Sequence, residues 1–223
     1  MSIIETIISL YAPLQCLACG TDGRIVCNGC IGRLPATESC CYRCQQPSRL
    51  GRTCAACRPN SRLVSANAAT NYEGWTKDLI WRLKFERAQS AAEIMAERLA
   101  LLYGGLIAED VLIVPLPTAR RRVRGRGYDQ AVLIARALAK RTGRRYAPLL
   151  MRLGSQEQIG ANKQQRQAQL QDVFRVKRPG LARGARILLI DDVMTTGASL
   201  ESAATTLHHA GAKTTGSLVF ARA

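Results

Sequence analysis

Cysteine spacing constrains the first quarter of this 223-residue chain more than any other feature does. All nine cysteines lie within residues 16–57, and eight of them form four Cys-x-x-Cys pairs. Two intervening residues let both sulfurs of a pair reach one ion, and two pairs complete a closed tetrahedral site. The candidate metal ligands are Cys16, Cys19, Cys27, Cys30, Cys41, Cys44, Cys54 and Cys57. The pattern predicts two structural zinc ions in two small ribbons, whose folding energy metal binding would supply.

The spacing leaves the pairing of these knuckles open. Sequential pairing joins 16/19 to 27/30 and 41/44 to 54/57, but crossed pairing fits the same spacing, and Cys40 has no assigned role. Iron–sulfur ligation and redox-active thiols are the competing interpretations. A disulfide framework would require an oxidising compartment. The apolar N-terminal segment has no basic start and no small-residue cleavage site, so we expect a cytoplasmic protein.

Hydrophobic patterning after the cysteines indicates an α/β fold with a mostly parallel sheet and flanking helices. The expected strands are residues 64–72, 111–114, 146–151, 187–190 and 214–221, and the expected helices are residues 74–86, 90–103, 130–141 and 198–210. We expect two domains: residues 1–60, with an N-terminal helix and the double zinc ribbon, and residues 61–223, the α/β domain. No stretch reaches the roughly 18 apolar residues of a membrane span.

One acidic segment carries the clearest functional signal. The apolar run at residues 187–190 leads into Asp191 and Asp192, and a Thr-Thr-Gly-Ala-Ser turn follows at residues 195–199. In open α/β sheets, ligands bind at the carboxyl ends of strands. A turn that opens a helix offers free N–H groups and the helix dipole to a phosphate monoester, and carboxylates suit ribose hydroxyls or hydrated Mg²⁺. The predicted phosphate seat comprises Thr195, Thr196, Gly197, Ala198 and Ser199.

Nearly all of the net positive charge falls in one third of the chain. The net charge is +16, and residues 111–186 alone carry 18 Lys or Arg against three acids. Such a field attracts phosphate, either on a small polyphosphate or along a nucleic-acid strand. An Arg-rich loop is expected over residues 120–126, in which Arg120 and Arg126 are the candidates for ligand contact. An ordinary solvated basic surface is the alternative.

The acidic segment resembles the signature with which type I phosphoribosyltransferases bind 5-phosphoribosyl 1-pyrophosphate (PRPP). Further motifs narrow the resemblance to the competence protein F (ComF) family across essentially the whole chain. Besides the four knuckles, these motifs are Leu83-Lys84-Phe85, Val114-Pro115-Leu116-Pro117, Arg126-Gly127-Tyr128-Asp129-Gln130, residues 152–158, Arg166 and Phe174-Arg175-Val176. Two positions depart from the expected pattern: Asp129 and Gln169 each stand where Asn is common.

The resemblance implies roles for individual residues. Asp191 and Asp192 would face the ribose hydroxyls of PRPP, bound with Mg²⁺, and residues 195–199 would hold its 5-phosphate. The loop that begins at Pro115 would receive the pyrophosphate, and Lys84 becomes a candidate ligand contact. The polar loop at residues 154–172, with Lys163 and Arg166, lies where a lid sits in the resembling fold, although a plain surface loop fits equally well.

Three functions compete. The resemblance to the ComF family implies a PRPP-binding protein of DNA uptake in natural transformation, which handles incoming single-stranded DNA with other uptake proteins. The alternatives are an active Mg²⁺-dependent phosphoribosyltransferase with an unknown amine or base as acceptor, and a zinc-ribbon adaptor with a vestigial transferase site. We rank them in that order, since the acid pair and the phosphate turn are intact and no acceptor motif or general base is evident.

Aromatic residues give little independent support for a strand-binding surface. They make up 5% of the chain, and we interpret Trp75 and Trp81 as core anchors rather than base-stacking platforms. DNA binding by this chain would therefore rest mainly on charge.

Overall fold

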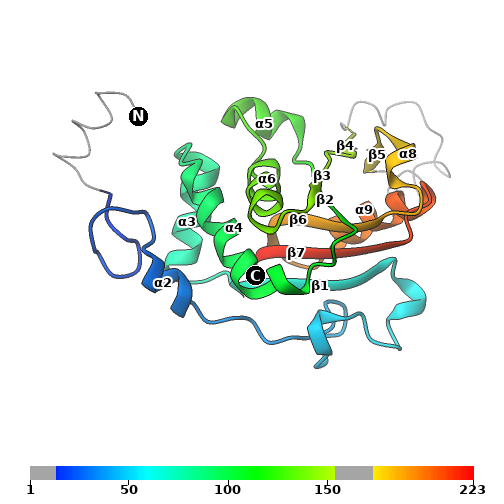
Figure 1. Ribbon diagram of the computed structural model, residues 1–223, viewed down its shortest axis with the longest axis horizontal. Coiled ribbons are helices and arrows are strands. Elements are labelled where there is room, and N and C mark those ends of the chain that lie inside the picture. The colour runs from blue at the N-terminus through cyan, green and yellow to red at the C-terminus, as the bar shows by residue number, and fades with distance from the viewer. Residues whose placement is uncertain (1–13, 154–172) are drawn as a thin grey trace, which may run out of the picture.

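A five-stranded parallel sheet forms the centre of the protein (Figure 1). The computed structural model describes residues 14–153 and 173–223. The strand order is β1-β7-β6-β2-β3. These strands are β1 (Leu63–Asn71), β7 (Thr214–Arg222), β6 (Arg186–Met194), β2 (Val111–Pro115) and β3 (Arg145–Tyr146). All four pairings between them are parallel. The expected α/β architecture with a mostly parallel sheet is therefore confirmed.

Alternation along the strands sends apolar side chains to both faces of this sheet. In β2, Ile113 belongs to one buried cluster, while Leu112 and Val114 belong to the other. In β7, Leu218 and Phe220 alternate in the same way with Val219. Because successive side chains of a strand point to opposite faces, the continuous apolar runs in the sequence are those of strands covered on both sides.

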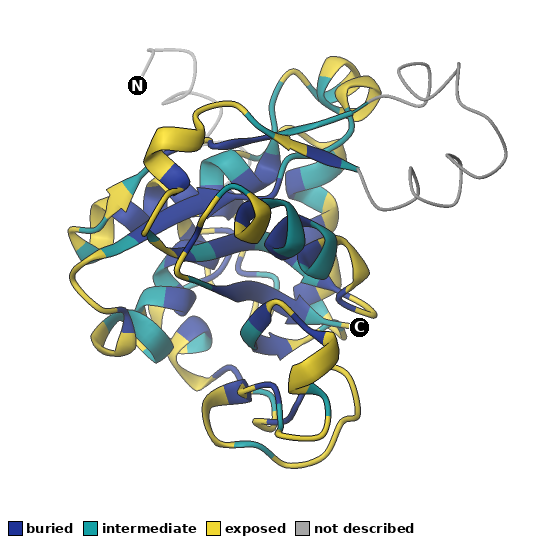
Figure 2. Cartoon of the chain, turned by 90° about the vertical axis from the view of Figure 1, so that its right-hand side faces the viewer, coloured by how far each residue is buried: buried dark blue, intermediate teal, exposed yellow. Residues whose placement is uncertain are grey.

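Helices cover the two faces of the sheet (Figures 1 and 2). The first cluster contains side chains of α3 (Trp75–Phe85), α4 (Ser90–Tyr103) and α6 (Gln130–Thr142). The second contains those of α9 (Ala198–His209), with a short helix α8 (Pro179–Ala182) at its side. The four longer helices match the expected ones, and α6 ends at Gly143, whose φ of 66° suits glycine.

Three expectations about local structure are wrong. The Arg-rich segment at residues 120–126 is a helix, α5 (Arg120–Arg126), because Arg favours helix and no proline interrupts the run before Gly127. The single strand expected at residues 146–151 is split around Pro148 into β3 and β4 (Leu150–Arg152). Strand β4 leaves the main sheet to pair antiparallel with β5 (Phe174–Val176). Finally, β6 extends four residues past Ile190, so it includes the acid pair.

The two ribbon segments pack on opposite faces of the sheet. Around α2 (Asn28–Arg33), Ile25, Val26 and Ile31 join the cluster of α3 and α4. The second segment, with the short turns η1 (Arg49–Gly51) and η2 (Arg58–Asn60), places Tyr42 in the cluster of α9. In Figure 1 these segments are the blue one at the left and the cyan one at the lower right. The expected N-terminal helix lies outside the described residues.

A buried arginine joins the first ribbon to α4. Arg98 is 3% exposed. Its guanidinium donates to Gly32 O at 3.3 Å and to Leu34 O, the carbonyls at the end of α2.

A remaining 3₁₀ turn, η3 (Gly104–Leu106), follows α4. No helix in residues 14–153 or 173–223 is both long and apolar enough to cross a membrane.

Arg98→Ala is expected to lower the free energy of unfolding by about 1–3 kcal/mol, because it leaves the buried Leu34 carbonyl without this donor. Urea denaturation of the zinc-loaded protein measures this change. Arg121→Ala is the matched control, since Arg121 is exposed on α5 and its loss should change stability by less than about 0.5 kcal/mol. Equal stability of the two variants would contradict the anchoring role of Arg98.

Candidate functional site

The candidate site lies beside β2, the strand from which the chain first adds a strand on one side of the sheet and later on the other. From β2 the chain passes to β3 on one side, and it later returns to β6 on the other side of β2. Ligands of open α/β sheets bind at such a switch point, beyond the carboxyl ends of the strands. A pocket of about 430 Å³ lies there. Its lining includes Tyr72, Lys84, Leu116, Pro117, Thr118, Ala119, Arg122, Arg126, Gln130, Arg152, Asp191, Asp192, Val193, Thr195 and Ser199. We call it the acid pocket.

Strand lengths expose the acid pair to this pocket. Pro115, the last residue of β2, is paired with Ile190, while β6 continues beside β7 as far as Met194. Past Ile190, β6 therefore has a strand neighbour on one side only. Asp191 and Asp192 fall in this overhang and line the pocket. The predicted acid pair is thus placed at the carboxyl edge of the sheet.

Lys84 of α3 balances the charge of Asp192. The carboxylate of Asp192 belongs to a residue that is 4% exposed, and its Oδ2 lies 2.5 Å from Lys84 Nζ. Within residues 14–153 and 173–223, Asp191 forms no ion pair of this kind, although its Oδ1 accepts from the Asp192 N–H at 2.9 Å. Burial, and then the neighbouring charge of Asp192, raise the pKa of Asp191 well above its usual value. The pair therefore attracts groups that favour its ionised form, such as a divalent cation or hydroxyl donors.

The turn after β6 separates two pockets. Gly197 stands at the N-terminus of the 12-residue helix α9 with a φ of 77°, a conformation that favours glycine. Thr195 and Ser199 line the acid pocket. Thr196, Gly197 and Ala198 line a second pocket of about 560 Å³, which the second ribbon borders. The predicted phosphate seat therefore opens a helix as expected, but only two of its five side-chain positions line the same pocket as the acids.

The second ribbon holds this turn through Glu201. Tyr42 OH donates to Glu201 Oε2, to which Ser61 Oγ also donates at 2.8 Å, and the Arg62 N–H donates to Glu201 Oε1 at 2.7 Å. Burial, and then the hydrogen bond with Glu201, raise the pKa of Tyr42 to about 12. The Tyr42 ring also lies against Gly197. Sequence reasoning missed this contact, because Tyr42 and Glu201 are 159 residues apart and no motif specifies either residue.

Asp129 fixes the loop on the opposite side of the acid pocket. Its Oδ2 accepts from the Thr118 N–H at 2.8 Å, and its Oδ1 accepts from Thr118 Oγ1 and the Ala131 N–H, each at 3.1 Å. The last of these bonds caps α6. The carboxylate thereby joins the loop after Pro115 to the start of α6. This use of both oxygens gives Asp129, one of the two departures from the expected pattern, a structural role.

Only some of the predicted basic residues reach the acid pocket. Arg126 lines it and donates to Gln130 Oε1 at 2.9 Å, and Arg122, which sequence reasoning did not single out, lines it too. Arg120 is exposed at the start of α5 and is not part of the lining. Lys163 and Arg166, like Gln169, lie outside the described residues.

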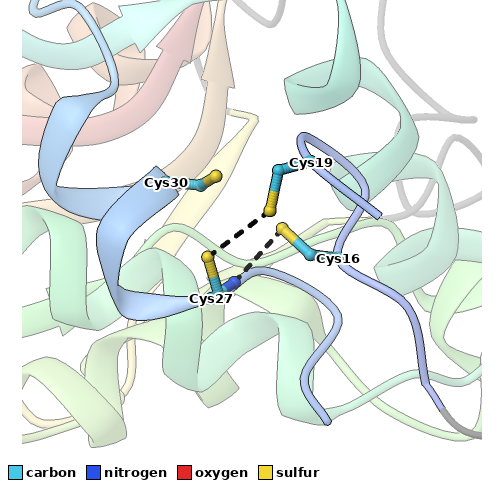
Figure 3. Close-up of side chains that lie close together, drawn as sticks. All are labelled: Cys16, Cys19, Cys27 and Cys30. Carbon is cyan, nitrogen blue, oxygen red and sulfur yellow. Dashed lines mark hydrogen bonds between the residues drawn. The ribbon is translucent and has the colours of Figure 1, made fainter. Parts of the chain in front are cut away.

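The eight knuckle cysteines form two groups by sequential pairing. Cys16, Cys19, Cys27 and Cys30 form the first group, shown in Figure 3. Cys41, Cys44, Cys54 and Cys57 form the second. Within each group the sulfurs lie within 4.8 Å of one another. Cys19 and Cys27 Sγ are 3.8 Å apart, and Cys44 and Cys54 Sγ are 3.6 Å apart. Four sulfurs at about 2.3 Å from a tetrahedral zinc would be separated by about 3.8 Å, so both groups fit zinc.

Backbone amides favour the thiolate that metal binding requires. Burial opposes ionisation of Cys16 and Cys41, but hydrogen bonds from N–H groups, those of Cys27 and Cys54 first, lower the pKa of each thiol to about 6. Hydrogen bonds with neighbouring knuckle thiols, that of Cys19 first, raise the pKa of Cys30 to about 12. Four thiolates therefore cannot coexist in one group unless a cation offsets their repulsion.

Cys40 lies outside both groups, and Arg222 Nη1 donates to its Sγ at 2.6 Å.

Comparisons with known proteins find one matching domain family and several similar proteins. The profile of the phosphoribosyl transferase domain family matches residues 129–223. Competence protein ComFC of Bacillus subtilis (strain 168) is 28% identical over 195 residues, covering 83% of this chain and 79% of that protein. The DNA utilization protein YhgH of Salmonella typhimurium is 28% identical over 204 residues, covering 85% and 86%. This chain is therefore homologous to ComFC and YhgH, and its residues 129–223 match the phosphoribosyl transferase domain family.

Some solved structures have a distant likeness to this chain. The allosteric regulatory enzyme of purine biosynthesis is 20% identical, with a TM-score of 0.45, over 59% of this chain and 25% of that one. The phosphoribosyl transferase match begins at Asp129 and includes β6, the acid pair, the phosphate turn and β7. Both four-cysteine groups precede the matched residues.

The protein is expected to bind two zinc ions per chain, measured by elemental analysis of the purified protein. Cys27→Ser and Cys54→Ser should each reduce the content to one, whereas Cys40→Ser, the matched control, should retain two. Because protons compete for the thiolates, the affinity for zinc should fall as the pH falls. Fewer than one zinc per chain in the wild type would refute the metal assignment.

Gly197→Ala is expected to destabilise the protein by about 1–3 kcal/mol, because alanine disfavours the left-handed backbone. A Cβ there would also lie 2.7 Å from Tyr42 Cδ2. Gly125→Ala, within α5, is the control: its Cβ would meet no atom within 4 Å, and alanine favours helix by about 1 kcal/mol. Urea denaturation compares the two. A loss of stability at residue 125 that equals the loss at residue 197 would argue against the close contact with Tyr42.

Proposed function

We propose that the protein binds PRPP together with Mg²⁺ in the acid pocket and acts in DNA uptake, where it handles incoming single-stranded DNA. The observation that carries the proposal is the overhang of β6, which brings two carboxylates and a helix-opening Thr-Thr-Gly-Ala-Ser turn to one edge of the sheet. Carboxylates and helix N-termini together suit a ligand that has vicinal hydroxyls and a phosphate. The printed names of the relatives, competence and DNA utilization proteins, support the biological role.

Each part of PRPP has a chemical counterpart at the site. We assign the 5-phosphate to the turn at residues 195–199, whose N–H groups open α9. Asp191 and Asp192 would accept from the ribose hydroxyls. The pyrophosphate would lie over the loop at residues 116–119, where Arg122 and Arg126 supply positive charge. Bound Mg²⁺ would neutralise part of the pyrophosphate charge.

The same proposal assigns the wider features of the chain. Residues 1–60 are the zinc-ribbon domain and residues 61–223 the phosphoribosyltransferase-like domain, in contact through Tyr42 and Glu201. Single-stranded DNA would bind through the basic surface of residues 111–186, which carries α5. A DNA-uptake role places the protein in the cytoplasm, together with other uptake proteins.

Phosphoribosyl transfer is a second candidate, favoured by the shape of the pocket. A groove of about 640 Å³ shares Tyr72, Lys84, Arg122 and Arg126 with the acid pocket and continues to Phe85. It leaves room for an acceptor beside the ribose. In such a reaction the acceptor nitrogen would bond to the anomeric carbon as the carbon–oxygen bond to pyrophosphate breaks, and the nitrogen would lose a proton. Release of pyrophosphate in the presence of candidate acceptors measures this activity.

Calorimetric titration of PRPP with Mg²⁺ tests the proposal. The wild type should bind, and an Asp191→Asn, Asp192→Asn double variant should lose the binding, because a neutral amide accepts from ribose hydroxyls more weakly than a carboxylate does. Asp110→Asn is the matched control, since Asp110 is an exposed acid that pairs with Arg186 at the other end of β6. It should bind PRPP as the wild type does.

The raised pKa of Asp191 adds a second measurement. If the bound state requires the carboxylate, PRPP affinity should rise as the pH rises through that pKa, and binding below it should release a proton to the buffer. Titrations in buffers of different ionisation enthalpy detect the proton. Absence of PRPP binding by the wild type would sink the proposal, and the ribbons and basic surface would become the functional candidates.

A further inference from the structure

The outer face of α3 carries two exposed aromatic side chains. Trp81 is 51% exposed and Phe85 is 62% exposed. Their ring centroids are 5.7 Å apart, one helical turn from each other. The expectation that Trp81 anchors the core is therefore wrong: Leu79, Ile80 and Leu83 fill that role, and Trp81 lies on the opposite side of the helix. Exposed aromatic surface of this kind marks sites of interaction more often than ordinary surface does.

This aromatic pair adjoins the acid pocket. Phe85 directly follows Lys84, whose ammonium contacts Asp192. The Arg126 guanidinium lies 5.3 Å from the centre of the Phe85 ring and also donates to Gln130 in the pocket lining. The groove that reaches Phe85 shares four residues with the acid pocket. A chain bound along this groove could therefore present one of its units to the pocket.

Charge around the pair favours an anionic occupant. Arg87, Arg122 and Arg126 line the groove beside Phe85. The acid Glu86 lies on the same helix, but Arg82 Nε is 3.6 Å from its carboxylate. Arginine surrounded by aromatic rings suits ligands that combine planar rings with phosphates. Among nucleic acids, a single strand presents free base faces together with phosphates, whereas a duplex stacks its bases internally.

We propose that Trp81 and Phe85, with Arg126, form a base-stacking subsite for single-stranded DNA at the mouth of the acid pocket. The bases would stack on the two rings while Arg87 and Arg122 contact the phosphates. This inference rests on the proposed DNA-handling function, and it gives that function a contact beyond general charge. It requires neither PRPP binding nor catalysis, so its test is made without PRPP and Mg²⁺.

The test compares a labelled dT 12-mer with an abasic oligonucleotide of equal length and charge, by fluorescence anisotropy at fixed salt. Trp81→Ala and Phe85→Ala should each weaken binding of the dT strand by roughly 5- to 100-fold, the usual effect of losing one stacking ring. Neither variant should change binding of the abasic strand. Leu101→Ala, a 62% exposed apolar residue on α4, is the matched control and should bind both strands as the wild type does.

Tryptophan emission gives an independent readout that does not depend on affinity. In a Trp75→Phe background, Trp81 is the only tryptophan, and dT should quench its emission while the abasic strand leaves it unchanged. If the Trp75→Phe variant folds poorly, the anisotropy comparison of Trp81→Ala and Phe85→Ala with the wild type still decides the question. Circular dichroism and the zinc content of each variant verify that it folds.

The possible outcomes separate this inference from the proposed function. Wild-type binding that Trp81→Ala and Phe85→Ala leave unchanged, or that is equal for dT and abasic strands, would overturn the stacking subsite and leave a purely charge-driven mode. No binding of any strand by the wild type would overturn the DNA-handling function as well. If sedimentation shows a dimer that Trp81→Ala abolishes, this result would also overturn the stacking subsite and would assign this face of α3 to a second copy of the chain.

Discussion

One ion pair at the carboxyl edge of the sheet determines how the site is assembled. Asp192 is 4% exposed, and a buried carboxylate is tolerated only when a partner balances its charge. Lys84 supplies that partner at 2.5 Å, which fixes the end of α3 above β6. Tyr128 OH also donates to Leu83 O, so the start of α6 holds the same helix end. The position of α3 in turn places Phe85 beside Arg126 and defines the groove.

The two ribbons have different relations to this site. The first is fixed to α4 by Arg98 and lies in the cluster of α3 and α4. The second reaches the phosphate turn, because Tyr42, inside the knuckle Cys41-x-x-Cys44, hydrogen-bonds to Glu201 in the first turn of α9. A metal bound by the second group of cysteines would therefore order a residue that contacts the turn. Zinc there would act as part of the site's framework rather than as a distant scaffold.

Sequence reasoning recovered the features that depend on local pattern. The apolar run of β6, the Thr-Thr-Gly-Ala-Ser turn and the amphipathic helices each have a signal within a few residues, and the structure contains all of them. The cysteine spacing predicted two groups of four cysteines but not their pairing, since sequential and crossed pairing fit the spacing equally. The prediction of a loop over the Arg-rich segment is wrong, because a run of charge does not fix the backbone conformation whereas arginine favours helix.

Features that arise from distant contacts were beyond the sequence. Nothing local distinguishes Trp81 from a core residue, since its exposure depends on which face of α3 meets α4 and the sheet. Glu201 resembles any acid in a first helical turn until Tyr42, 159 residues away, is placed beside it. Likewise, the charge run did not indicate that Arg122, rather than Arg120, lines the acid pocket together with Arg126. These positions follow from the register of β6 and from the placement of α5.

The most direct test of the central claim is a crystal structure of the protein with PRPP and Mn²⁺, in which anomalous scattering locates the metal. The account predicts the 5-phosphate on the turn at residues 195–199, the ribose hydroxyls at Asp191 and Asp192, and the anomalous peak beside the pyrophosphate. PRPP bound instead in the neighbouring pocket between Tyr42 and Thr205, or away from β6, would contradict it.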